Sequence, residues 1–433
     1  MRTRLAEPHV ALALGALAVV AAEYGYRRAT SDAWLLLEAA SAASALLVAW
    51  REQQRLRLVP ILALAATFQL AYLAVHAHLG VVGDIDSRLV FRWQGNAILD
   101  GYYPRSEYPV GAVLLFALEA WLGGGATRWA NALLMVPFQL ACVACVWAVR
   151  TPFAAWLAAV VAIWPLNAFS WEFKYDLAPT AFLALGIVLA VRGRYGWSGV
   201  ALALGAALKW SPVLAVLVLL VHLVARRSWR SAIVHAAAFA ATLAAVYVPF
   251  LLWDADAVAA AYTRQADRPI TAESVWYLPL HVMGLADVRG HISYGAGAPD
   301  WANVAAGVVQ FAAVLAVVLL AARATPRGAA ALAALAPTLF LLTNRIFSPQ
   351  FVILAFVSWA LAGALVVRTR REQLAVAAAA ALASAANAFV YPFALPFYAT
   401  TWQLASATLF VVGLVLTVWL AVEVARAPAA SRA

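Results

Sequence analysis

Residues 177–227 read LAPTAFLALGIVLAVRGRYGWSGVALALGAALKWSPVLAVLVLLVHLVARR, and this stretch decides the fold class. Three apolar runs are separated by Arg-Gly-Arg at 192–194 and by Lys-Trp-Ser-Pro at 209–212. A membrane span takes about 20 residues, so the apolar region 196–225 is too long for one helix, and its proline favours a break. With the break at 209–212, both arginine clusters lie on the same side of the membrane. The stretch therefore predicts three successive membrane-spanning helices.

The composition extends this interpretation to the whole chain. Of its 433 residues, 66% are hydrophobic and 12% are charged, whereas soluble domains carry about 25% charged residues. The net charge of +10 comes from short basic clusters between apolar runs, which is the pattern of membrane topology rather than of a nucleic-acid-binding patch. We therefore expect an all-α polytopic membrane protein, with a single transmembrane domain over residues 1–433 and no nucleic-acid partner.

The apolar runs predict about 14 spans, several of them short. The expected spans are residues 9–24, 31–50, 58–79, 130–149, 152–169, 177–191, 196–208, 212–225, 231–252, 301–323, 329–344, 349–367, 373–390 and 401–425.

The basic clusters set the expected orientation. With both termini in the cytoplasm of a plasma membrane protein, nearly every loop that carries arginines faces the cytoplasm. The weakest point of this arrangement is the pair Arg27 and Arg28, which it places outside. Every aspartate also falls outside, together with the only two lysines, Lys174 and Lys209. We therefore expect an extracytoplasmic active site.

Two outer segments are long, residues 80–129 and 253–300, while most inner loops take few residues. The apolar run 108–122 begins with Tyr108-Pro109 and contains Glu119. We therefore expect a helix lying at the outer interface there, rather than a span. Long loops with charged and aromatic residues are usually functional, so we expect both segments to contribute to function.

The first outer loop carries acidic residues that suit acid–base chemistry. Asp84 and Asp86 follow the third span, and Arg88 and Arg92 come next. A carboxylate at a membrane surface can act as a general base toward a sugar hydroxyl, and neighbouring arginines can hold a phosphate or keep the carboxylate ionised. The alternative is a solvated loop with ion pairs, and composition alone favours that alternative.

Both lysines lie at outer helix junctions. Lys174 is surrounded by aromatic residues and followed by Asp176, so it can either bind an anionic headgroup or snorkel from an aromatic belt. Lys209 interrupts two apolar half-helices. A charge at that depth is costly, so we expect either a phosphate or an outer aspartate as its partner, or snorkelling to the interface.

A further polar group lies at residues 344–351. Ser348 is expected to cap a helix that has Pro349 at its first position. Capping does not account for Asn344, Arg345 and Gln350, which can hydrogen-bond a polar ligand.

The sequence contains no motif for nucleotide, metal or redox chemistry. It has no Walker A motif, no dinucleotide-binding glycine pattern and no His-Glu-x-x-His. His76 and His78 are two residues apart, which puts them on different helix faces. Cys142 and Cys145 lie in an apolar run without a charged neighbour, which favours buried packing over redox activity. Any energy for a reaction must then arrive with the substrate.

Three stretches carry a family resemblance: ILDGYYPRSEYPVGAVLLF at 98–116, FKYDLAPTAFLALGIVLAVRGRYGWSGVALALGAALKWSP at 173–212 and FSPQFVIL at 347–354. They are similar to motifs of the GT-C superfamily of membrane glycosyltransferases. The closest similarity is to the polyprenyl-phosphate-mannose-dependent mannosyltransferases of glycosyltransferase family 87. Two positions depart from that family's pattern, because Val90 stands where the family has a tyrosine and Val110 where it has a proline.

The resemblance implies a GT-C-like helix bundle and an inverting reaction in which a first-loop aspartate deprotonates the acceptor hydroxyl. By position that base is Asp86, whose distance to Trp93 fits the family's spacing, with Asp84 as the second candidate. The resemblance further implies contacts to the donor phosphate or headgroup from Lys209, Lys174, Arg345 and Arg92. It assigns the shaping of the substrate site to Glu107, Tyr108, Asp176 and Gln350.

The sequence therefore predicts an inverting glycosyltransferase that moves a sugar, expected to be mannose, from a polyprenyl-phosphate donor to a hydroxyl of a cell-envelope glycolipid or glycan. A polyprenyl-phosphate-arabinose-dependent transferase is the nearest alternative. A transporter or lipid flippase is the alternative from another class, but it should show repeat symmetry and ionisable residues at the bilayer midplane. The expected partners are the lipid donor, the acceptor and membrane lipids. No cofactor is expected to be required, and assistance by a divalent metal stays open.

Overall fold

The computed structural model of the protein describes residues 7–29, 31–81, 86–168, 172–287, 296–393 and 400–426. Within these ranges every regular element is a helix. Ten helices of the described chain are long and apolar enough to cross a membrane. The protein is therefore a multi-pass, all-α membrane protein, as the sequence predicts.

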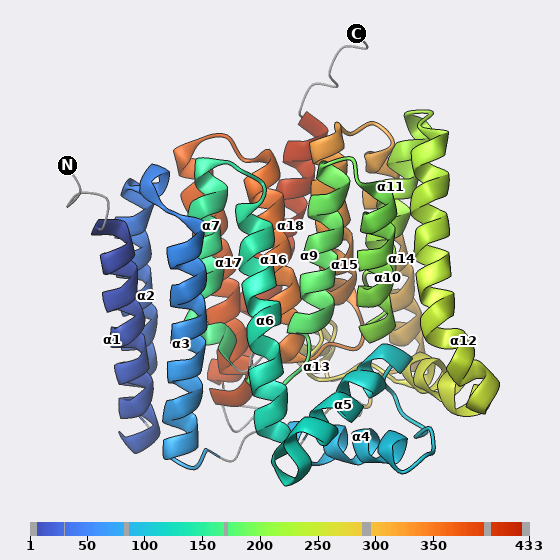
Figure 1. The fold of residues 1–433 in the computed structure, drawn as a ribbon, viewed down its shortest axis with the longest axis horizontal. Helices are drawn as coiled ribbons and strands as arrows, with labels where there is room; N and C mark the ends of the chain where they lie inside the picture. Colours follow the sequence, from blue (N-terminus) through green and yellow to red (C-terminus); the bar gives the residue numbers. More distant parts are fainter. Residues whose placement is uncertain are drawn as a thin grey trace.

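Fourteen described helices run side by side as a bundle (Figure 1), one for each expected span. Their bounds are α1 Glu7–Ala29, α2 Asp32–Arg51, α3 Leu58–His78, α6 Thr127–Trp147, α7 Pro152–Ile163, α9 Leu177–Val191, α10 Tyr195–Leu208, α11 Val213–Ala225, α12 Trp229–Asp267, α14 Asp300–Ala321, α15 Pro326–Thr343, α16 Val352–Val366, α17 Arg370–Ala388 and α18 Thr400–Arg426. The stretch 177–227 forms α9, α10 and α11, so the predicted break at 209–212 is confirmed.

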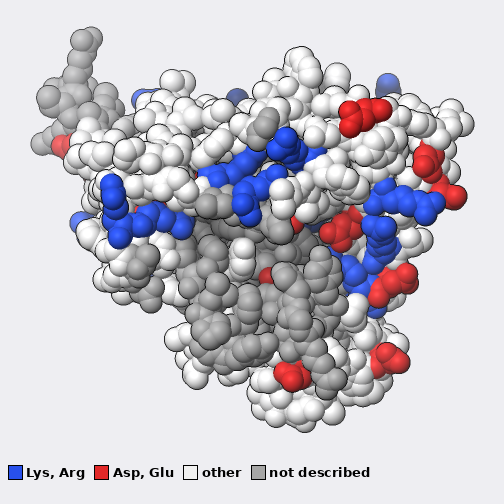
Figure 2. All heavy atoms as spheres, turned by 90° about the horizontal axis from the view of Figure 1, so that it is seen from below, with Lys and Arg blue, Asp and Glu red and all other residues white. Residues whose placement is uncertain are grey.

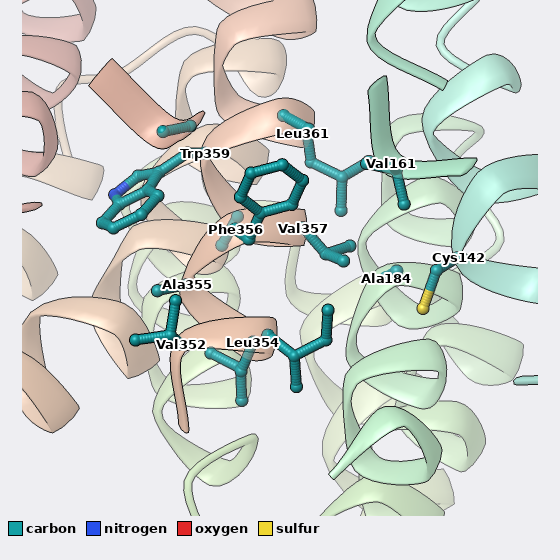
Figure 3. Packing of buried hydrophobic residues seen from close by; sticks show 14 of the residues in the cluster. Cys142, Val161, Ala184, Val352, Leu354, Ala355, Phe356, Val357, Trp359 and Leu361 are labelled. Carbon is teal, nitrogen blue, oxygen red and sulfur yellow. The ribbon is translucent and has the colours of Figure 1, made fainter. Parts of the chain in front are cut away.

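The core of the bundle is formed by α7, α9, α15 and α16. Figure 3 shows Phe356 and Val357 of α16 pointing toward Val161 and Ala184 on neighbouring helices, close to Cys142. Cys142 and Cys145 are buried and carry free thiols, which agrees with the predicted packing role. Helices α15 and α16 are buried over most of their length. These central helices therefore form a rigid support for the residues at their ends.

Two shorter helices, α4 (Phe91–Leu99) and α5 (Val110–Gly123), lie across one end of the bundle, at the bottom of Figure 1. The run 108–122 therefore does not continue along the bundle axis, as predicted. A small apolar cluster joins this region to the end of α12, and its members are Tyr103, Val110, Val113, Ala257 and Val258.

Helix α12 bends at Asp254, where φ is −152° and ψ is 88°. The Asp254 carboxylate accepts a hydrogen bond from the backbone N–H of Ala257 at 2.9 Å. An aspartate that accepts such a bond starts a new helix, so the chain turns after the expected span 231–252 and continues as residues 255–267. Figure 1 shows this second part of α12 turning across the lower end of the bundle beside α5.

The two ends of the bundle differ in charge. The start of α1, the end of α18 and the loops with the clusters Arg51–Arg57, Arg192–Arg194, Arg226–Arg230 and Arg368–Arg371 lie at the upper end in Figure 1. The lower face, shown in Figure 2, carries acidic and basic side chains close together. Arg27 belongs to this lower end and pairs with Glu23 at 2.6 Å. Arg27 therefore has an acidic partner on its own helix at this end.

Candidate functional site

A cavity of about 920 Å³ opens at the lower end of the bundle. It lies where α10 and α15 end and where α5, α9 and α16 begin, so its walls come from segments far apart in the sequence. Eight of the ten predicted site residues line it: Asp86, Glu107, Tyr108, Lys174, Asp176, Lys209, Arg345 and Gln350. The structure thus brings the four polar regions singled out in the sequence to one place.

Each lysine of the cavity faces a carboxylate. Lys174 Nζ lies 2.5 Å from Asp86 Oδ2, and Lys209 Nζ contacts Asp176 Oδ1. The Asp86 side chain is 26% exposed, whereas that of Asp176 is 3% exposed. A cation in contact with a carboxylate favours its ionised form. Asp86 is therefore an accessible carboxylate with a cationic partner, and Asp176 is a buried carboxylate that fixes Lys209.

Lys209 sits at the turn between α10 and α11 because Pro212 ends the α10 hydrogen-bond ladder. Its Nζ also lies 3.6 Å from the centre of the Phe351 ring, at the start of the α16 region. Burial lowers the pKa of Lys209, while Asp176 opposes that shift. The ammonium group is thus held by one carboxylate and one aromatic face at the floor of the cavity.

A second group of charged side chains holds segment 172–176 on the side away from the cavity. This segment carries both Lys174 and Asp176. His76 of α3 contacts Glu23 of α1 through Nε2 and Glu172 through Nδ1. These three side chains, called the sealed network here, are at most 1% exposed. Asn131 of α6 adds a hydrogen bond from its side-chain amide to the Glu172 carbonyl at 3.2 Å. Helices α1, α3 and α6 therefore all hold the segment that supplies the site lysine.

Sequence reasoning missed the sealed network, since His76 was considered only as a metal ligand. The available signal was Glu23, a carboxylate inside an apolar helix, because such groups are costly in a membrane and need a partner. The identity of the partner depends on the packing of α1 against α3, which a span prediction does not contain.

Tyr108 is held at the cavity by aromatic packing. Its ring lies 5.2 Å from Phe116, 5.8 Å from Tyr175 and 5.9 Å from Phe91, in edge-to-face contacts. Burial, with a smaller contribution from nearby carboxylates, raises the pKa of the Tyr108 phenol well above its usual range. The phenol therefore stays protonated and can donate a hydrogen bond.

The opposite wall of the cavity is cationic. Arg345 donates a hydrogen bond to the main-chain carbonyl of Ala266, a neutral acceptor. Arg268 lies 3.4 Å from the Glu107 carboxylate. Thr271 binds the Arg345 carbonyl through its backbone N–H at 2.9 Å, which fixes the second outer segment against the end of α15. This wall can therefore receive an anion.

Arg268, Gln265 and Glu273 line the cavity but were not singled out in the sequence. The segment 253–300 was expected to be functional as a whole, yet no spacing within it distinguished these residues. They reach the cavity because α12 turns at Asp254, and that turn was not predicted.

The structure does not confirm the expectations for Arg92, Asp84 and the side chain of Ser348. Arg92 is exposed on α4 and is not among the residues that line the cavity. Asp84 lies outside the described residues. The expectation that Ser348 caps a helix is wrong for its side chain: the Ser348 hydroxyl donates to Gln350 Oε1 at 2.6 Å instead of accepting a backbone hydrogen bond. That contact orients Gln350 at the cavity wall.

The cavity combines an accessible carboxylate with cationic and hydrogen-bonding groups on other walls. Such a set suits the removal of a proton beside an anionic leaving group. In a comparison with protein families, the family described as glycosyltransferase family 87 matches residues 107–349, more than half of the chain. A comparison with curated proteins finds no match. The matched range contains both lysines and Arg345 and begins after Asp86.

Proposed function

Because the chain belongs to glycosyltransferase family 87, we propose that it is an inverting transferase that moves mannose from a polyprenyl-phosphate donor to a hydroxyl of a cell-envelope glycolipid or glycan. The observation that carries this proposal is the accessible Asp86 carboxylate in a cavity whose other walls hold Lys209 and Arg345. A glycosyltransferase without a nucleotide-binding domain suits a donor that is itself lipid-linked, since the energy of the reaction then resides in the glycosyl phosphate bond.

In the proposed reaction Asp86 removes the proton of the acceptor hydroxyl. The acceptor oxygen attacks the anomeric carbon, the bond from that carbon to the phosphate oxygen breaks, and the electron pair leaves with the lipid phosphate. The proton stays on Asp86 until solvent takes it. Attack from the face opposite to the leaving group inverts the anomeric configuration. Lys174, in contact with Asp86, keeps the carboxylate ionised before the reaction and so prepares it to act as a base.

The leaving group gains negative charge, because the phosphodiester becomes a phosphate monoester. Cations placed where charge develops lower the barrier more than they stabilise the bound substrate. We propose Lys209 and Arg345 as these cations, with Lys174 shared between the base and the phosphate. Glu107, Tyr108, Asp176 and Gln350, which also line the cavity, would shape the sugar and acceptor sites. Arg92, which lies away from the cavity, would contribute to headgroup binding only from the outer surface of α4.

The proposed location is the plasma membrane, with both termini cytoplasmic and the cavity extracytoplasmic. The arginine clusters support this orientation, since they lie at the end of the bundle opposite the cavity (Figure 1). The position of α4 and α5 across the cavity end of the bundle agrees with the interfacial placement proposed for them. A lipid monophosphate sugar requires no metal in this scheme.

The proposal is tested by incubating the purified protein in liposomes with acceptor lipids and radiolabelled polyprenyl-phosphate mannose, and separately with polyprenyl-phosphate arabinose. Transfer of the mannose label to a new glycolipid is the expected result. Transfer of arabinose alone would keep the mechanism and correct the sugar. Movement of the labelled lipid across the bilayer without transfer would overturn the proposal in favour of a flippase.

A further inference from the structure

The cavity extends to a part of the bundle that the proposed reaction does not use. Its lining includes Gly307 and Gln310 of α14, together with Trp210 and Phe340. Trp210 is 38% exposed, and its ring packs edge-on against Phe340 with the ring centres 4.5 Å apart. The polar cavity therefore continues into an apolar mouth beside α14.

Gly307 marks the edge of this mouth. It is exposed, and a Cβ atom built at this position would meet no atom within 4 Å. On the same helix, Val308 points away from the cavity and is 62% exposed. Gln310 ties α14 to α15 by a hydrogen bond to the Phe340 carbonyl at 2.9 Å. Gly307 therefore leaves room at the cavity side of α14, while Gln310 keeps the contact between α14 and α15.

An apolar track continues from the mouth along α11. Leu217 and Val224 are 44% and 41% exposed, and Val213 and Leu220 are half-buried. These residues follow helical spacing and form one narrow stripe that begins directly after Trp210-Ser211-Pro212. The rest of α11 is covered by its neighbours, α12 and α14 among them. The stripe thus runs from the cavity along α11 to its last turn, on the lipid-facing side of the bundle.

We infer that the hydrocarbon chain of the lipid-linked donor leaves the cavity sideways past Gly307, between Trp210 and α14, and lies along the exposed stripe of α11. This inference rests on the proposed function, because a free sugar phosphate would have no chain to place. A branched prenyl chain suits the track, since the mouth and the stripe offer aromatic and branched aliphatic side chains and the phosphate end of the cavity is cationic. The site therefore selects donors by chain as well as by headgroup.

In the test, a chemical label blocks the apolar mouth after the protein has folded. Cys142 and Cys145 are buried, so Gly307→Cys introduces a thiol that can be labelled selectively with methanethiosulfonate reagents of increasing size. Val308→Cys is the matched control, one residue away on the lipid-facing side. Each labelled protein is assayed with two glycosyl phosphates that carry the same sugar, one on a long prenyl chain and one on a single short isoprenoid unit.

The labelled Gly307→Cys variant is expected to lose about tenfold or more of kcat/KM with the long-chain donor, because the label displaces the chain from its apolar contacts. With the short-chain donor it should keep the rate of the unlabelled variant, and the labelled Val308→Cys control should be unaffected with both donors. Equal loss with both donors, or no loss with either, would overturn the inference. Failure of the unmodified protein to transfer sugar from either donor would instead overturn the proposed function, so the two failures are distinguishable.

Discussion

Two groups of charged side chains meet at segment 172–176 and differ in their access to the cavity. The ion pairs Asp86–Lys174 and Asp176–Lys209 line the cavity, and Asp86 is open enough to meet a substrate. The sealed network, Glu23–His76–Glu172, lies on the other side of the same segment and is almost entirely buried. Charged side chains thus face the cavity on one side of the segment and fix its position on the other.

The comparison teaches that contact with the cavity, rather than residue type, separates the two groups, because Lys174 and Asp176 are also buried. A buried charge must be paired, because an unpaired one costs several kcal/mol in a medium of low dielectric constant. The members of the sealed network pair with one another and, at Glu23, with Arg27, and none of them lines the cavity. The cavity pairs can be rearranged by an incoming anion, since phosphate can replace a carboxylate beside an ammonium group.

Loss of the carboxylate at Asp86 should give the largest effect. Asp86→Asn keeps the shape of the side chain and removes its capacity to take a proton, so kcat should fall by about 10²–10⁴-fold. The measurement is the initial rate of label transfer from polyprenyl-phosphate mannose, with the melting temperature of the purified protein as the folding control. Asp84→Asn is the companion variant. A normal rate for Asp86→Asn would remove this residue from the reaction.

Opening the sealed network should act on stability. His76→Ala leaves Glu23 and Glu172 buried without their shared partner, which should cost about 3–5 kcal/mol. The expected readout is a large fall in the melting temperature in detergent, while His78→Ala, an exposed neighbour on α3, should leave it unchanged. Simultaneous replacement of Glu23, His76 and Glu172 by leucine should restore most of the stability. If His76→Ala melts like the unmodified protein, the network does not support the segment.

Removal of the Lys209 charge should have an intermediate effect on catalysis. Lys209→Met keeps the length of the side chain but removes a charged hydrogen-bond donor, worth about 1.5–3 kcal/mol, so kcat/KM should fall by about 10–100-fold. Lys209→Arg should recover only part of this loss, because a planar guanidinium does not replace an ammonium over the Phe351 ring. Full activity of Lys209→Met would mean that the phosphate is bound elsewhere in the cavity.

The smallest effect is expected at Arg268. Its contact with Glu107 is 3.4 Å long and both side chains are partly exposed, so Arg268→Gln should change the unfolding free energy by less than about 1 kcal/mol. Any change in kcat/KM should stay within a few-fold and weaken further as salt is added. A loss as large as that of Lys209→Met would show that the second outer segment contacts the donor directly.

The sequence predicts those parts of the molecule that depend on local patterns. The apolar runs and Lys209-Trp210-Ser211-Pro212 are enough to separate α10 from α11, because proline and a lone lysine act on their own segment. Glu119 in a short apolar run correctly argued against a further span at 108–122. The gathering of Lys174, Lys209 and Arg345 at one end follows from the alternation of the helices.

The remaining features depend on contacts between distant segments. Nothing near Lys174 in the sequence indicates that Asp86 is its partner, since 88 residues separate them. The cavity position of Arg268 depends on the turn of α12 at Asp254, and the Ser348 hydroxyl prefers a neighbouring side chain to a backbone donor. Each of these contacts depends on how the side chains pack in the folded protein, which sequence periodicity does not describe.

The position of Glu23 also constrains how the protein can be made. Helix α1 enters the membrane early in synthesis, but His76 lies 53 residues further along the chain, and Glu172 another 96 residues beyond it. During that interval the Glu23 carboxylate would have no partner in the membrane without Arg27. Arg27 lies one helical turn away on the same helix and pairs with Glu23 at 2.6 Å. Arg27 therefore offers Glu23 a partner on its own helix before α3 has been made, and the same pair is kept in the folded protein, so the order in which helices emerge becomes part of what the sequence must encode.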